Sequence, residues 1–125
     1  MKKATGFLAI AIILCFIAGA AIAGQMMTGS VTGTGSSINV SCGFIPDAVQ
    51  VTNITNGTAK TMWWNKAMGN GKAVFVNGTA GPKVAASNGI TPYAGSYTAA
   101  KGFTIGTSAN QVNTSGDTLT WVAYQ

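Results

Sequence analysis

The sequence predicts an all-β fold: a single small antiparallel β-sandwich, jelly-roll-like, that follows an N-terminal apolar helix. Three observations predict it. Beyond residue 23, the 125-residue chain is a series of short runs rich in Val, Ile, Thr and aromatic residues, separated by turn residues. Four Asn-Gly dipeptides, at 56–57, 70–71, 77–78 and 88–89, suit the tight turns of β-hairpins. Residues 24–125 show no apolar periodicity of an amphipathic helix.

The N-terminal segment, residues 1–23, has the pattern of a secretory signal peptide. Lys2 and Lys3 precede an uncharged apolar run that ends on Ala21-Ile22-Ala23, which predicts cleavage before Gly24. The run is also near the lower length limit for spanning a bilayer, so an uncleaved transmembrane anchor is the alternative. We therefore expect an exported protein, either extracellular, on the cell surface or in a virion, and membrane-anchored if the leader is kept. Membrane contact is expected only through this segment.

The remaining chain divides at residue 37. Residues 24–37 are rich in Gly, Ser and Thr and predict a flexible arm. Residues 38–125 form the expected β-sandwich domain, with strand-like runs SINVSC, DAVQVTNI, TAKTMWW, KAVFVN, KVAAS, GFTIG and TLTWVAY in chain order. Cys42 lies in phase with Ile38 and Val40 and is expected to be buried, although an intermolecular disulfide is the alternative.

The composition argues against catalysis, cofactors and nucleic acid. The chain has no histidine and only two carboxylates, Asp47 and Asp117, so no catalytic residues are assigned and no enzyme is expected. No metal site or cofactor is expected either, because Cys42 has no nearby histidine or second cysteine. The basic residues are seven lysines, and removal of the leader lowers the net charge from +5 to +3. Scattered lysines without arginine are not typical of a nucleic-acid surface.

Two adjacent tryptophans, Trp63 and Trp64, supply the first candidate binding residue. Neighbouring side chains of a strand point to opposite faces, so the two rings cannot form one stacking platform. Trp64 shares its face with Met62 and is expected in the core, which leaves Trp63 outside, covered by a partner. The other interface or binding candidates are Tyr93, Tyr97 and Tyr124.

Two segments, Gly43–Val74 and Gly102–Gln125, carry a family resemblance. Their motifs run in the order G-F-x-P (Gly43, Phe44, Pro46), V-x-V-x-N (Val49, Val51, Asn53), the tryptophan pair, GFTIG (Gly102–Gly106) and W-V-A (Trp121–Ala123). This order resembles small β-domain structural proteins of tailed bacteriophages, of the virion or decoration type. The resemblance implies a compact β domain that decorates a capsid or completes a tail or fibre. The added leader departs from that group, whose virion proteins assemble in the cytoplasm.

Two functions are expected from these features. The first is a non-enzymatic structural or assembly protein, either a phage virion component or an exported self-associating surface protein. Its partners would be copies of itself or other virion or surface structural proteins. The alternative is a secreted, adhesin-like β module that binds carbohydrate or a surface through exposed aromatics with Asn and Thr, and its partners would be glycans.

Overall fold

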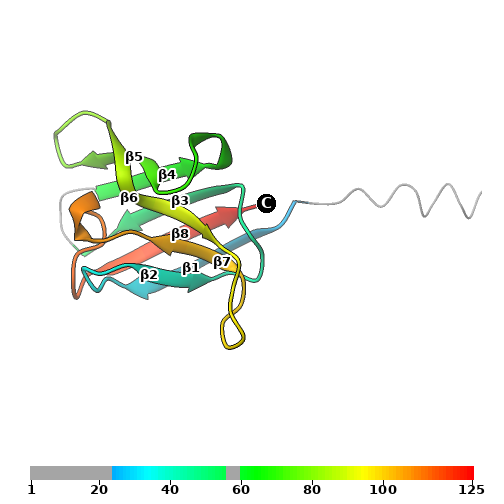
Figure 1. Ribbon diagram of the computed structural model, residues 1–125. Coiled ribbons are helices and arrows are strands. Elements are labelled where there is room, and N and C mark those ends of the chain that lie inside the picture. The colour runs from blue at the N-terminus through cyan, green and yellow to red at the C-terminus, as the bar shows by residue number, and fades with distance from the viewer. Residues whose placement is uncertain (1–23, 56–59) are drawn as a thin grey trace, which may run out of the picture.

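The computed structural model describes residues 24–55 and 60–125, and the expected N-terminal helix, signal peptide or anchor of residues 1–23 lies outside them. The described chain forms one antiparallel eight-stranded sheet in the order β1-β8-β3-β4-β5-β6-β7-β2 (Figure 1). The all-β antiparallel class predicted from the sequence is thus confirmed. The strands are β1 (Met26–Thr32), β2 (Ile38–Ser41), β3 (Ala48–Asn53), β4 (Lys60–Asn65), β5 (Lys72–Asn77), β6 (Lys83–Tyr93), β7 (Gly102–Ile105) and β8 (Thr118–Tyr124), with short 3-10 turns η1 (Lys66–Met68) and η2 (Ser108–Asn110).

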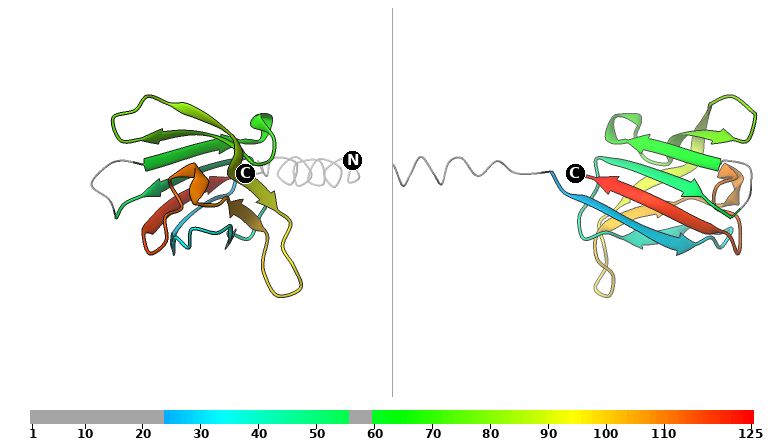
Figure 2. Two further views of the ribbon diagram at one scale, coloured as in Figure 1. Left: turned by 60° about the vertical axis from the view of Figure 1, so that its left-hand side comes forward. Right: turned by 180° about the vertical axis from the view of Figure 1, so that it is seen from behind.

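The sheet curls until it is nearly barrel-shaped, which brings its inner face together around one core (Figures 1 and 2). All eight strands are hydrogen-bonded into one sheet, whereas a sandwich has two separate sheets. The reason is that β8 pairs with β1 on one side and with β3 on the other. Strand twist then bends the single sheet round on itself. The two edges of the sheet are β1 and β2, which are consecutive in the chain.

The segment expected to be a flexible arm contains β1, which corrects that expectation. Residues Met26–Thr32 pair antiparallel with β8 along its whole length. The glycines of this segment led to the prediction of flexibility, but one of them, Gly29, has a packing role because it lies opposite Trp121. A Cβ atom at Gly29 would fall 2.6 Å from Cζ2 of the Trp121 indole. A glycine required by a neighbour 92 positions away cannot be distinguished, in the sequence, from one in a linker.

The core is formed by alternate residues of the strands, which point inward. Met62 and Trp64 are both buried on β4, so the prediction that Trp64 belongs to the core is confirmed. The Trp64 indole N–H donates to the carbonyl of Gly69 at 2.8 Å, which satisfies its only polar atom. Cys42 is also buried, as expected, and is a free thiol that donates to the Phe44 carbonyl at 3.2 Å. The other buried apolar residues are Val40, Phe44, Val49, Val51, Ala73, Ile90, Phe103, Ile105, Val112, Leu119, Trp121 and Ala123.

Three buried polar side chains hold the loops between strands to the body. The Asn113 amide donates to the carbonyls of Ser36 and Gly106, and its oxygen accepts from the Thr34 N–H. Asn53 donates to the Val112 carbonyl at 3.0 Å and to the Asp117 carboxylate at 2.7 Å. Most buried polar groups in proteins are hydrogen-bonded, and here these contacts fix the loops after β1 and before β8.

No helix within residues 24–55 and 60–125 is long and apolar enough to cross a membrane.

Candidate functional site

The candidate site lies on the outer face of the curled sheet, over β1, β8, β3, β4 and β5. Strand alternation directs side chains outward wherever their neighbours are buried. Gln50 and Thr52 flank buried Val51, and Thr120 and the apolar Val122 flank buried Trp121. Strand register aligns these residues in rows, so that Thr52 lies opposite both Thr61 and Thr120. The outer face is therefore an ordered array rather than a scatter of polar groups.

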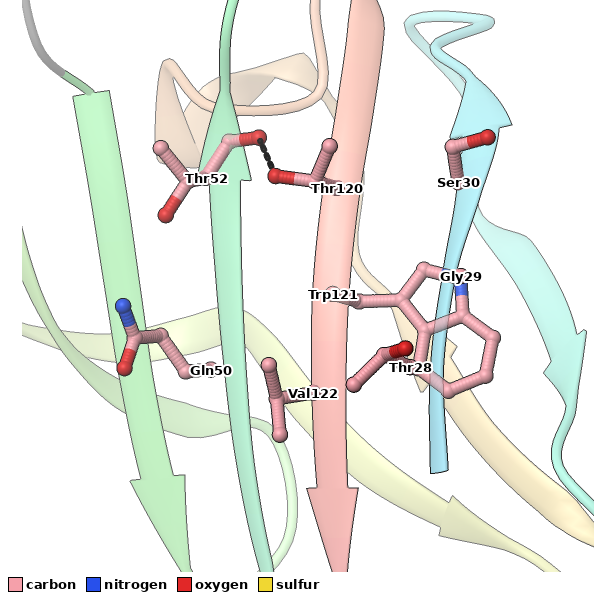
Figure 3. A pocket seen from close by; sticks show the side chains of 8 residues that line it. All are labelled: Thr28, Gly29, Ser30, Gln50, Thr52, Thr120, Trp121 and Val122. Atoms are coloured by element: carbon pink, nitrogen blue, oxygen red, sulfur yellow. Dashed lines mark hydrogen bonds between the residues drawn. The ribbon is translucent and has the colours of Figure 1, made fainter. Parts of the chain in front are cut away.

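One part of this face is a shallow, hydroxyl-rich depression of about 460 Å³ between β1, β8 and β3 (Figure 3). Its outward side chains are Thr28, Ser30, Gln50, Thr52, Thr120 and Val122. The Thr120 hydroxyl donates to the Thr52 carbonyl at 3.4 Å, and the Thr52 and Thr61 hydroxyls lie 3.2 Å apart. These contacts hold the hydroxyls on rigid strands.

The indole of Trp121 lies beneath this depression, against the inner side of β1 at Gly29 (Figure 3). Its ring makes an edge-to-face contact with Phe103, with centroids 5.5 Å apart and planes at 75°. The indole nitrogen is buried and has no hydrogen-bond partner among the described residues. Trp121 is therefore part of the core under β1 and not an exposed platform.

The second part of the face is an apolar groove of about 290 Å³ beside the first. Trp63 and Tyr124 line it on either side of β3, with Ala48 and Gln50 between them. Trp63 is 40% exposed and Tyr124 is 46% exposed. Gln50 borders both parts, so the depression and the groove lie next to each other. We call this combined surface the outer-face groove.

The residues that line the outer-face groove carry no charge. The nearest ion pair joins Lys66 of η1 to Asp47 at 3.2 Å, with both side chains more than half exposed. An exposed pair of this kind contributes at most about 1 kcal/mol. Apolar contact and neutral hydrogen bonds are thus the interactions that this surface can make.

The structure brings together two of the four residues predicted as binding candidates. Trp63 and Tyr124 share the outer-face groove, as described above. Tyr93 ends β6 and is half-buried, whereas Tyr97 is completely exposed in the loop between β6 and β7. Neither tyrosine lines the groove.

Several groove residues were not identified from the sequence. Gln50, Thr52 and Thr120 alternate with buried valines and tryptophan, and that alternation was the available signal. The sequence does not reveal that β3 pairs with both β4 and β8, and this pairing brings these residues onto the same face as Trp63.

Among residues 24–55 and 60–125, no three His, Cys, Asp or Glu side chains gather in a way that could hold a metal ion. No protein-family model, curated protein or solved structure matches the chain.

Proposed function

We propose that this protein is a non-enzymatic structural or assembly protein that packs its outer-face groove against another copy of itself or another structural protein. It would serve as a virion component, as its resemblance to phage structural proteins implies, or as an exported self-associating surface protein. One observation carries the proposal: Trp63 and Tyr124 are held half-exposed around one groove on a domain whose other two tryptophans are buried.

The position of Trp63 makes it a rigid anchor. It lies on β4 between β3 and β5, opposite Gln50 on one side and Val74 on the other. Because the backbone of Trp63 is already ordered, this protein loses little conformational freedom when a partner covers the ring. Large aromatic residues at the centre of an interface commonly contribute most of the binding energy.

The exposed apolar surface continues past Tyr124 to the edge of the sheet. Met26 lies opposite Tyr124 in the β1–β8 pairing and is 64% exposed. Contiguous apolar surface of this kind is typical of protein interaction sites. Uncharged lining residues add to this, because their burial removes no charge from water.

The effect of removing the anchor follows from its exposure. Two fifths of a tryptophan surface of roughly 250 Å² is about 100 Å², which corresponds to about 2.5 kcal/mol at 25 cal/mol per Å². Part of that is lost to the costs of association, so we expect Trp63→Ser to weaken self-association by roughly tenfold to sixtyfold. Sedimentation velocity of residues 24–125 over a concentration series measures this directly.

The matched control is Tyr97→Ser, which removes an even more exposed aromatic side chain from the loop between β6 and β7. It should leave association within about twofold of the parent protein. A parent protein that stays strictly monomeric at high concentration, or two substitutions that weaken association equally, would contradict the proposal.

The second candidate function is an adhesin-like module that binds carbohydrate. The observation that favours it is the set of neutral hydrogen-bonding groups in the outer-face groove: the amides of Gln50 and Asn65 beside Trp63, and the hydroxyls of Thr52 and Thr120 in the depression. An apolar platform with a few placed polar groups suits a neutral ligand with many hydroxyls. Two results together would favour this function: the protein does not self-associate, and it binds glycans on an array in a way that Trp63→Ser abolishes.

A further inference from the structure

We propose that β1 is an exchangeable strand, which leaves the β8 strand of its own copy and pairs with β8 of a second copy of the chain. This inference rests on the proposed function and adds a second contact, beside the outer-face groove, through which copies would be linked.

The first argument is that β1 is the less buried of the two edge strands, β1 and β2. None of its seven residues is fully buried, and only Val31 packs partly against the core. Its partner β8 is different, because Leu119, Trp121 and Ala123 are all buried. The strand is therefore attached mainly by its backbone pairing to β8, and the same pairing is available on the β8 of another copy.

The second argument is that the chain is fixed immediately after β1. The Gly33 N–H donates to the Asp117 carbonyl at 2.7 Å, and the Gly33 carbonyl accepts from the Gly116 N–H at 2.9 Å. Asn113 holds the next residues, Thr34 and Ser36. The base of the strand is thus clamped to the body, and movement is confined to the residues before Gly33.

The third argument is that nothing described blocks the path of the strand. In the described chain β1 pairs only with β8, so its other edge faces β2 across the opening of the curled sheet (Figure 2). A pocket of about 320 Å³ separates Met26 and Met27 from Cys42 and Phe44 at this opening. The strand carries no proline or charged residue, the usual protections of an exposed edge. It can therefore move outward without crossing another strand.

The identity of the partner follows from Gly29. A strand that pairs with β8 in this register without displacing the Trp121 indole needs glycine opposite it, because a Cβ atom there would lie within 3 Å of the ring. A strand from a second copy of this chain meets that requirement at the correct position. Exchange of an identical element preserves the native contacts and is a low-cost route to assembly.

The test locks the strand to its own copy. Ser30 and Thr120 lie directly opposite each other, and directly opposed strand residues have Cα separations within the range of a disulfide. Ser30→Cys and Thr120→Cys are combined on a Cys42→Ala background and oxidised at low concentration, where the disulfide closes within one chain. The protein is then concentrated with and without reductant, and its mass is measured by light scattering.

We expect the assembled fraction of the oxidised protein to be at least tenfold lower than that of the reduced protein, which should assemble like the Cys42→Ala parent. Equal assembly of both forms would overturn strand exchange and leave the proposed function standing. A parent that never assembles would overturn both.

A second measurement serves if the double variant does not fold. Ser30→Cys and Thr120→Cys are placed in separate chains and mixed, and the disulfide-linked heterodimer is quantified. Mixing Ser30→Cys with Tyr97→Cys gives the rate of random oxidation. Exchange predicts at least tenfold more heterodimer in the first mixture, and equal yields contradict it.

Discussion

Replacement of Asn113 by alanine should destabilise the protein strongly, although this side chain lies in no strand and contributes no apolar surface. The residue is completely buried, and its amide makes three hydrogen bonds: from Thr34 N–H at 3.1 Å, to the Ser36 carbonyl at 2.6 Å and to the Gly106 carbonyl at 2.7 Å. Together these join the loop after β1 to the end of β7. Alanine retains none of the three.

The expected magnitude follows from those contacts. Each hydrogen bond contributes about 1 kcal/mol net, and the loss of one at a buried group costs more than the loss of one at a group that water can reach. The Gly106 end is buried, whereas the Thr34 and Ser36 ends lie in exposed residues that water can reach. We therefore expect a loss of about 3–4 kcal/mol in the free energy of unfolding, or a fall in Tm of about 12–25 °C for a domain of this size.

Urea unfolding followed by tryptophan fluorescence, together with differential scanning calorimetry, measures the change. Asn39→Ala is the matched control, because Asn39 is an exposed asparagine whose side-chain oxygen accepts one described hydrogen bond, from the Thr104 hydroxyl at 2.7 Å. It should lower stability by less than about 1 kcal/mol. The reasoning fails if Asn113→Ala unfolds within 3 °C of the parent protein or no earlier than Asn39→Ala.

Three further predictions concern the tryptophans and the thiol. Gly29→Val should displace the Trp121 indole, with a changed near-ultraviolet circular dichroism spectrum and faster amide hydrogen exchange along β1; an unchanged spectrum would contradict the described packing. Trp64→Phe removes the hydrogen bond to the Gly69 carbonyl and leaves a cavity in the core, because Phe is smaller than the buried indole. We expect a loss of about 2–3 kcal/mol in urea unfolding. Buried Cys42 should react with a thiol reagent at least about a hundredfold more slowly in the folded protein than in urea, and equal rates would refute its burial.

The strands that the sequence predicted well are those with strong local patterns. The strand-like runs DAVQVTNI and TLTWVAY predicted β3 and β8. The rule that adjacent strand residues point apart assigned Trp64 to the core and Trp63 to the surface, and both positions are confirmed. In each case a strand periodicity of two residues is sufficient, so no knowledge of distant partners is needed.

The arm was predicted wrongly because its strand lacks such a pattern. β1 has glycine at an inward position and no buried residue, and it becomes a strand only because β8 offers an edge for it. The same limit applies to Asp117 and Asn53, whose 2.7 Å contact joins residues 64 positions apart. Contacts of that separation leave no local signature.

The sequence by itself determined the all-β class and the opposite directions of Trp63 and Trp64, and it named Tyr124 among four binding candidates. Only the tertiary structure decided that one curled sheet, rather than two layers, surrounds the core, and that Trp63 and Tyr124 meet across β3 while Tyr93 and Tyr97 do not. The physical reason is that side-chain direction is set by the backbone within a strand, whereas neighbours are set by which strands pair. In this chain β3 and β8 are adjacent in the sheet although 64 residues separate the end of one from the start of the other.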